Sequence, residues 1–244
     1  MAHQVPSPEA PLLRQWLRPP AGEWVTAVVL LCIHSIVRAA SLWRPGLLPI
    51  SMVLLWPMPW LLSNRIGRRT LGLRATSRAW VLVSVPLGAI ALFGCAFAAW
   101  ALFGTGEHNW LVQHAHALDR TASTMPPTLS SPQVFWFLTI PAMVFSPLAE
   151  EFLFRGYLLR SLSPTLGIGW ALVAQAAAFA LLHLLHYGLR PFDPLLLLLW
   201  LPSMFGVAMF FGWLSVRSGS LWPPILAHSS FNLAMNFVSL ATFG

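Results

Sequence analysis

The sequence predicts an all-α membrane protein, a polytopic helical bundle of about seven transmembrane helices. Of its 244 residues, 57% are hydrophobic and only 9% are charged, whereas soluble domains carry roughly 25% charged residues. The mean hydropathy is +0.69, and several apolar runs are long enough to cross a bilayer. This composition excludes a soluble enzyme, a DNA-binding domain and a secreted disulfide scaffold.

The expected helices follow from the lengths of the apolar runs and from the residues that interrupt them. The run at residues 47–62 contains Pro49, Pro57 and Pro59, so we expect it to be kinked or partly re-entrant. A short turn at residues 163–169 joins the fourth and fifth helices, which we expect to pack as an antiparallel hairpin. The seven runs are residues 24–42, 47–62, 80–103, 134–157, 170–187, 194–214 and 221–240.

These runs divide the chain into three regions. Residues 1–23 are rich in proline, and we expect them to form a flexible or interfacial N-terminal arm. Residues 24–133 hold accessory transmembrane helices and an outer loop. Residues 134–244 hold the remaining four helices, where the polar residues of interest lie.

The arginines predict the orientation in the membrane. All fourteen basic residues are arginine, and a cytoplasmic N-terminus places ten of them at cytoplasmic helix ends. Arg44, Arg120 and Arg190 then lie outside, and Arg38 lies within the first helix. The positive-inside rule favours this orientation. The composition, with arginine but no lysine and with many Ala and Leu residues, suggests a bacterial plasma (inner) membrane. The ten are Arg14, Arg18, Arg65, Arg68, Arg69, Arg74, Arg78, Arg155, Arg160 and Arg217.

The longest polar stretch, residues 105–133, is expected outside as a solvated, partly helical loop. It contains three histidines, but only Glu107 and Asp119 lie near enough in the sequence to complete a set of metal ligands. We therefore expect no metal site in this loop. The three histidines are His108, His114 and His116.

Two adjacent glutamates lie within the fourth apolar run. Ionisable residues inside membrane helices are costly, so each is a functional candidate. Glu151 and Arg155 are four residues apart and can form an ion pair on one helical face. Glu150 is rotated by about 100° from Glu151, and Phe154 stands four residues after it, so we expect Glu150 to have no partner within its own helix. Glu151 and Arg155 are thus predicted as a supporting pair, and Glu150 as a group available for chemistry.

The fifth and seventh helices carry the other candidates. Glu150 lies 16 residues before Leu166 in the connecting turn and His183 lies 17 residues after it, so both are expected at equal depth. His228 and Asn232 are four residues apart and share one helical face. We therefore expect a site between helices four, five and seven. The remaining membrane histidines are expected to serve packing or hydrogen bonding. They are His34 and His186.

This set of groups suits the hydrolysis of an amide. A carboxylate and an imidazole around one water form a general-base pair, and a histidine with an asparagine supplies donors for an oxyanion. The sequence contains neither Gly-x-Ser-x-Gly nor His-Glu-x-x-His. Zinc bound by Glu150, His183 and His228 is conceivable by ligand type, but Asn232 is a poor zinc ligand. The sequence therefore favours a site without metal or other cofactor.

The three motifs resemble those of the CPBP intramembrane proteases. The motifs are Glu150-Glu151-x-x-x-Arg155, Phe179-x-x-x-His183 and His228-x-x-x-Asn232, and the resemblance covers residues 134–240. That family includes the CAAX prenyl endopeptidases and bacteriocin-processing or Abi-like proteins. The resemblance implies a helical membrane fold with a site reached from one side of the bilayer.

The resemblance also implies roles for the site residues. Glu150 and His183 would activate water, and His228 and Asn232 would hold the oxyanion. Glu151 and Arg155 would be the supporting ion pair. These roles define a glutamate-type intramembrane peptidase, a hydrolase similar to the CAAX proteases.

The expected function is therefore an intramembrane endopeptidase that cuts near the membrane surface. Its expected partners are a membrane-anchored protein or peptide substrate and the lipid bilayer, with no nucleic acid. Two alternatives remain open. One is an immunity or scaffold protein with the CPBP fold and no proteolysis. The other is a proton-coupled transporter that uses Glu150 and His183 as a relay, although no internal repeat of the kind common in transporters is visible.

Overall fold

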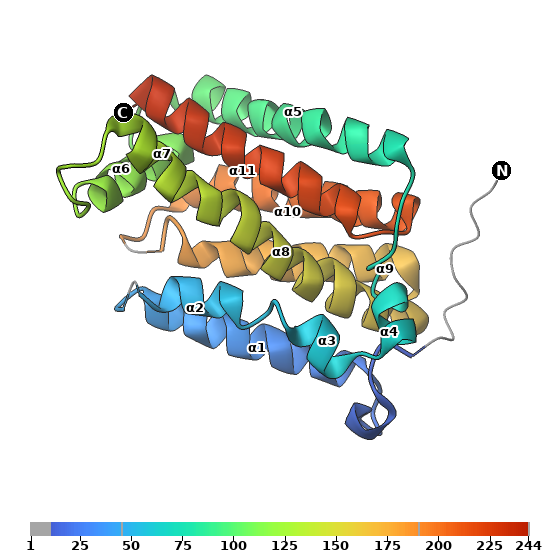
Figure 1. The fold of residues 1–244 in the computed structure, drawn as a ribbon. Coiled ribbons are helices and arrows are strands. Elements are labelled where there is room, and N and C mark those ends of the chain that lie inside the picture. The colour runs from blue at the N-terminus through green and yellow to red at the C-terminus, as the bar shows by residue number, and fades with distance from the viewer. Residues whose placement is uncertain (1–10, 45, 190, 244) are drawn as a thin grey trace.

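The fold is a bundle of helices, seen here in a computed structural model that describes residues 11–44, 46–189 and 191–243. The described residues form no β-strand. The longer helices run side by side along one direction (Figure 1). The structure thus confirms the all-α helical membrane bundle. The longest helices of the described residues are α1 (Trp24–Ser41), α5 (Arg78–Phe103), α9 (Leu159–Leu182), α10 (Pro194–Ser218) and α11 (Trp222–Phe243).

Four helical segments of the described chain are long and apolar enough to span a membrane: Trp24–Ser41, Arg78–Phe103, Ser131–Leu185 and Pro194–Ser218. The third has 55 residues, far more than the roughly 20 that one crossing needs. Its chain reverses at Gly167, whose φ of 73° and ψ of 158° are not helical. This segment therefore forms two antiparallel passes joined by a turn, as predicted for residues 163–169.

The structure does not confirm the predicted number of seven spans. The second predicted span is broken into α2 (Leu47–Val53) and α3 (Met58–Leu62), each far shorter than a bilayer crossing. This break confirms the expected kink and follows from prolines, which cannot donate the helical hydrogen bond. The last helix, α11, is long enough, but its polar side chains lower its hydropathy. The most polar of them are His228, Asn232 and Asn236.

The fourth predicted span contains two π-helical segments. It begins as α7 (Ser131–Ile140), passes through a π-helix at Pro141–Phe145 into α8 (Ser146–Glu151), and then enters a second π-helix at Phe152–Leu158. π-helical turns are rare and occur frequently at functional sites. The short helix between them carries both glutamates of the first motif.

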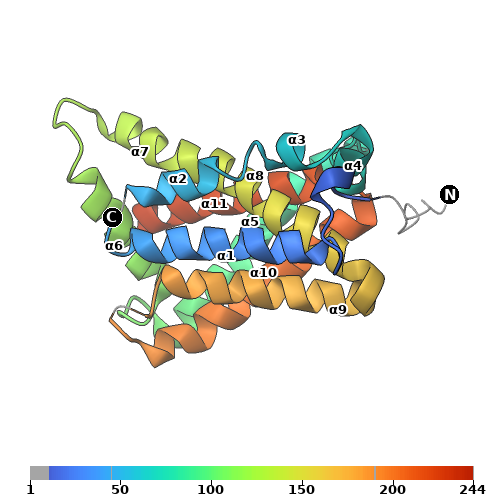
Figure 2. The same cartoon turned by 90° about the horizontal axis from the view of Figure 1, so that it is seen from below.

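Helix α11 lies at the centre of the bundle. It packs against α5, α10, the first π-helix and α6 (Trp110–Ala122). The approach to α5 is very close, since a Cβ atom on Gly88 would lie only 1.9 Å from the carbonyl oxygen of Ala227. Glycine at this position therefore lets the two backbones pack directly. Figure 2 shows α1 in front, with α7 and α8 on one side of it and α9 and α10 on the other.

The region predicted as a solvated outer loop is only partly solvated. Helix α6 forms within it, and Trp110, Leu111 and Ala115 are buried there. They are buried because α6 packs against α11. The partly helical character was predicted correctly, whereas the loop as a whole is part of the bundle.

The described part of the N-terminal arm is held against the bundle. Leu12 and Leu13 are buried, and their backbone N–H groups donate hydrogen bonds to the Glu23 carboxylate at 2.9 and 2.8 Å. Residues 1–10 of the predicted arm lie outside the described residues.

The bundle has two chemically different ends. The arginine-bearing helix α4 (Arg65–Thr70) lies at one end and α6 at the other (Figure 1). Ser77 directly precedes α5 and Ser123 directly follows α6, and both are exposed. Cysteines at these two positions therefore report on opposite ends of the molecule.

If the arginine distribution sets the topology, Ser77→Cys and Ser123→Cys are expected to label from opposite sides of the membrane. The background would carry alanine at Cys32 and Cys95. A membrane-impermeant maleimide added to intact cells should modify the cysteine at 123 at once, and the cysteine at 77 only after the membrane is opened. Modification of both in intact cells, or of position 77 alone, would disprove the predicted orientation.

Candidate active site

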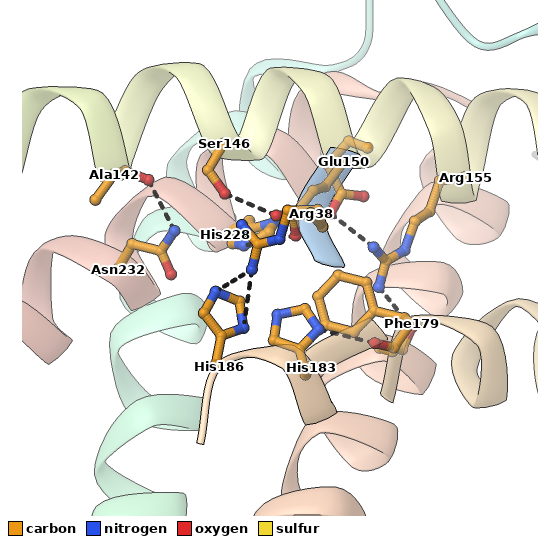
Figure 3. A network of polar contacts seen from close by, with 12 residues as sticks. Arg38, Ala142, Ser146, Glu150, Arg155, Phe179, His183, His186, His228 and Asn232 are labelled. Atoms are coloured by element: carbon orange, nitrogen blue, oxygen red, sulfur yellow. Dashed lines mark hydrogen bonds and ion pairs between the residues drawn. The ribbon is translucent and has the colours of Figure 1, made fainter. Parts of the chain in front are cut away.

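One cavity of about 460 Å³ brings the four candidate catalytic side chains together. Glu150 comes from α8, His183 follows α9 directly, and His228 and Asn232 come from α11. The wall therefore draws on the three helices that the sequence selected. Figure 3 shows how these groups lie around the cavity.

Glu150 presents one bonded and one unbonded carboxylate oxygen. Its side chain is only 2% exposed. Oε1 accepts a hydrogen bond of 2.9 Å from the Ser146 hydroxyl. Oε2 has no hydrogen-bond partner among the described residues and lies 3.9 Å from Nε2 of His228. The expectation that Glu150 lacks a partner in its own helix is therefore wrong, because Ser146 lies one turn before it.

Glu151 and Arg155 form the ion pair that their spacing predicted. The guanidinium Nη1 donates to Oε1 at 2.9 Å, and both side chains are fully buried. Nη2 donates to the Ala208 carbonyl of α10, and the guanidinium lies 4.7 Å from the centre of the Phe179 ring. Glu151 Oε1 also contacts Nδ1 of His228 at 3.0 Å. This second partner comes from another helix, so the spacing of residues along one helix does not predict it.

The ring of His183 is held in one orientation. Its Nδ1 lies 2.7 Å from the Phe179 carbonyl oxygen, and the ring stacks on that of Phe179 at 4.2 Å. A carbonyl oxygen only accepts hydrogen bonds, so Nδ1 carries the proton and Nε2 holds a lone pair. Trp200 donates its indole N–H to the His183 carbonyl at 2.9 Å. His183 can therefore accept a proton through Nε2.

His228 is oriented in a similar way by a carboxylate. Glu151 accepts from Nδ1, and the ring stacks on Phe211 at 5.0 Å. This leaves Nε2 on the side of Glu150. The Glu151 carboxylate therefore fixes the orientation of the ring.

Asn232 is anchored to the first π-helix. Its amide nitrogen donates to the Ala142 carbonyl at 2.8 Å, and the side chain lines the cavity. The amide group carries two hydrogens, so it can donate one to Ala142 and the other into the cavity. Figure 3 shows this contact at the end of the site away from Arg155.

Comparison with protein families identifies the region that holds this site. Residues 132–234 match the family described as "Type II CAAX prenyl endopeptidase Rce1-like". The match supports membership of the CPBP family. No curated protein and no solved structure matches the chain. The match confirms the resemblance to the CPBP proteases, and it contains Glu150, Glu151, Arg155, His183, His228 and Asn232.

The family match indicates the general class of the protein. The Rce1-like family is a family of CAAX-type membrane proteases, and its members act on membrane-associated peptides. Together with the apolar helices, the match identifies a multi-pass membrane protein of a protease family.

Two residues that the sequence argument did not select also line the cavity. Arg38 of α1 is only 3% exposed, and its guanidinium contacts the ring of His186 (Figure 3). His186 was expected to serve packing or hydrogen bonding, and its contact with Arg38 agrees with this, but it also lines the cavity. An arginine inside an apolar helix is itself a strong functional signal, and this signal could have identified Arg38. It lies outside the matched Rce1-like region.

His114 was expected in a solvated loop, but it is part of the cavity wall. Its Nδ1 lies 2.6 Å from the Tyr187 hydroxyl, and its Nε2 lies 2.8 Å from Oδ1 of Asn236. Burial lowers the pKa of His114, against the opposing effect of the Asn236 hydrogen bond. Both ring nitrogens are occupied by protein groups, so His114 serves to tie α6 to the Rce1-like region.

The side chains do not assemble a ready metal site. Within the described residues, no group of three or more His, Cys, Asp or Glu side chains is placed to hold a metal ion. His183 and His228 each use Nδ1 within the protein. Nε2 of each ring is therefore the nitrogen left for the cavity.

Proposed function

We propose that the protein is a glutamate-type intramembrane endopeptidase. It hydrolyses a peptide bond near the membrane surface in a membrane-anchored protein or peptide. One observation supports this proposal most strongly. The buried Oε2 of Glu150, which lacks a hydrogen-bond partner among the described residues, shares a cavity with two oriented imidazoles and an amide.

Glu150 and His183 would activate the attacking water. A water between Oε2 of Glu150 and Nε2 of His183 donates one hydrogen bond to each acceptor, which directs its lone pair toward the substrate. Ser146 fixes the carboxylate through Oε1, so Oε2 stays directed at the water. As the water attacks the carbonyl carbon, Glu150 takes its proton and later delivers it to the departing amine.

His228 and Asn232 would stabilise the oxyanion that forms in this step. The second N–H of Asn232 and a protonated Nε2 of His228 can both donate to it. Protonation of His228 needs a negative partner at Nδ1, and Glu151 supplies it at 3.0 Å. Arg155 balances the charge of Glu151 when the ring is neutral. Glu151 and Arg155 are thus positioning residues.

Water is the expected nucleophile because neither thiol is near the site. Cys32 is exposed and Cys95 is partly buried, and neither is among the residues that line the described cavity. A catalytic cysteine would need a neighbouring base. The mechanism therefore has no thioester intermediate.

The cavity reaches the end of the bundle where α6 lies, since His114, Leu118 and Thr121 of α6 line it. That end is opposite to the arginine-bearing helix α4 (Figure 1). We propose that the protein lies in a bacterial plasma membrane with its N-terminus in the cytoplasm. In this orientation, the substrate reaches the site from the outer face.

Purified protein in proteoliposomes tests the proposed function. A single-span peptide with fluorophores on both sides of its membrane anchor should be cut, and mass spectrometry should give the two fragments. Proton-driven uptake of a solute without cleavage would instead support the transporter. Neither cleavage nor uptake across a panel of anchored peptides would favour an immunity or scaffold protein.

The proposed mechanism requires no metal, so protein stripped with a chelator should still cut its substrate. Elemental analysis would first show that the protein is metal-free, and kcat should then stay within about twofold of the untreated enzyme. If activity disappears on stripping and returns with one equivalent of zinc, this mechanism is wrong. Glu150, His183 and His228 would then be reassigned as ligands.

A further inference from the structure

Arg38 is a buried cation in the wall of the catalytic cavity. It is 3% exposed and lines the same space as Glu150 and His183. Figure 3 shows its guanidinium beside Glu150 and above the His186 ring. Because α1 lies outside the matched family region, this cation is an addition to the motif residues.

The charge of Arg38 is not neutralised by a paired carboxylate. Within the described part of the chain, the ion pairs involve Arg18, Arg155, His108 and His228, but not Arg38. Its guanidinium contacts the imidazole of His186. The ring accepts a hydrogen bond there only in its neutral form. Glu150 acts on Arg38 electrostatically, but it lies beyond ion-pair distance.

The two buried arginines of this region, Arg38 and Arg155, differ in the partners of their guanidinium groups. Arg155 has a carboxylate at 2.9 Å and a backbone carbonyl, and aromatic rings surround it. Arg38 has a neutral ring and an open cavity. A buried charge is costly unless it is paired, so an anion that enters the cavity gains a partner that is already in place.

We propose that Arg38, held by His186, is the carboxylate-binding subsite of this cavity. The proposal rests on the proposed function, because the ligand is the peptide that the site cuts. Guanidinium binds carboxylate through two parallel hydrogen bonds. Arg38 therefore selects peptides with a carboxylate at a fixed distance from the scissile bond.

The size of the cavity limits that distance. About 460 Å³ is toward the small end of the range for ligand pockets, so the segment between Glu150 and Arg38 holds only a short stretch of peptide. The carboxylate can belong to the free C-terminus of the substrate or to an Asp or Glu side chain near the cut. Both sources present the same chemistry to the guanidinium.

Three matched substrates distinguish the sources. The first is an anchored peptide with a free C-terminal carboxylate, the second is its C-terminal amide, and the third is the amide with a Glu in place of a Gln near the cut. Wild-type enzyme should cut the first at least about tenfold faster in kcat/KM than the second if the terminus binds. If the third substrate is cut as fast as the first, the carboxylate that Arg38 binds is a side chain near the cut instead.

Arg38→Gln should bring the ratio of kcat/KM for the acid to that for the amide down to about one, whatever its effect on the absolute rates. Arg38→Lys should keep part of the preference, since it retains the charge but not the two-pronged geometry. Arg44→Gln is the matched control, because it removes an exposed arginine six residues later, beyond the end of α1 and outside the cavity wall. It should leave the preference unchanged.

Two results would overturn the subsite. One is a wild-type enzyme that cuts all three substrates at equal rates. The other is an Arg38→Gln variant that loses activity equally on all three, which would make Arg38 a partner of Glu150 alone. If Arg38→Gln does not fold, the Arg38→Lys variant provides the test. Its ratio of kcat/KM for the acid to that for the amide should lie below the wild-type ratio, and an unchanged ratio would overturn the subsite.

A binding measurement separates this proposal from the proposed function. Short peptide acids and their amides can be titrated into the detergent-solubilised protein while its thermal unfolding is followed. Stabilisation by the acid alone, lost in Arg38→Gln and weakened in Arg38→Lys, supports the subsite even if no peptide is cut. Cleavage without any acid preference, together with equal stabilisation by both peptides, would support the protease and reject the subsite.

Discussion

Glu150→Gln is expected to abolish peptide cleavage while the protein keeps its fold. The substitution preserves the size of the side chain and an oxygen that can accept from Ser146. It removes the group that takes the proton from water, and general bases contribute roughly 10²–10⁴-fold to a rate. We therefore expect kcat to fall by at least about a hundredfold, with thermal unfolding close to that of the wild type.

Two controls make this result specific. Glu107→Gln changes an exposed glutamate beyond α5 and should cleave normally. Ser146→Ala removes the hydroxyl that fixes Oε1 and should reduce kcat by only about tenfold, whereas a nucleophilic serine would lose all activity. Normal cleavage by Glu150→Gln would show that another group is the base.

The sequence predicted the fold class and the hairpin because both depend on simple properties of the chain. Apolar composition and the length of apolar runs fix the membrane helices, and the turn at Gly167 joins two long runs. The number of spans was not predictable in the same way. Residues 47–62 are apolar enough, but their prolines divide them into two short helices.

The candidate site was predictable because its members repeat at helical spacing. Glu151 and Arg155 are four apart and pair as expected, and Glu150 and His183 reach one cavity from equal chain lengths on either side of the turn. These relations need only helix geometry and a hairpin. They need no knowledge of how other helices pack.

Apart from the bond of Ser146 to Glu150 one turn later, the contacts that were missed join elements distant in sequence. The bond from His228 to Glu151 links α11 with α8, and the contact of Arg38 with His186 links α1 with the end of α9. His114 enters the wall because α6 packs on α11. Spacing within one helix carries no information about such pairs. The π-helices were missed for a related reason, since the hydrophobic pattern does not reveal one extra residue in a turn.

Glu151→Gln is expected to damage both stability and catalysis, because one carboxylate serves two partners. Arg155 loses its counter-charge in a fully buried position, and breaking a buried pair costs about 3–5 kcal/mol. For a chain of this size, such a loss lowers the unfolding temperature by roughly 10 °C. His228 keeps a hydrogen-bond acceptor but loses the charge that supports a proton on Nε2.

Two further variants separate these effects. Arg155→Met removes the cation but leaves the contact of Glu151 with His228, so it should be destabilised yet retain most of its kcat per folded molecule. Replacing both Glu151 and Arg155 by Met removes the buried charges together, which is often neutral for stability. That double variant should regain most of the lost unfolding temperature and still cut roughly a hundredfold more slowly. If it recovers activity along with stability, Glu151 only neutralises Arg155, and the orientation of His228 does not depend on it.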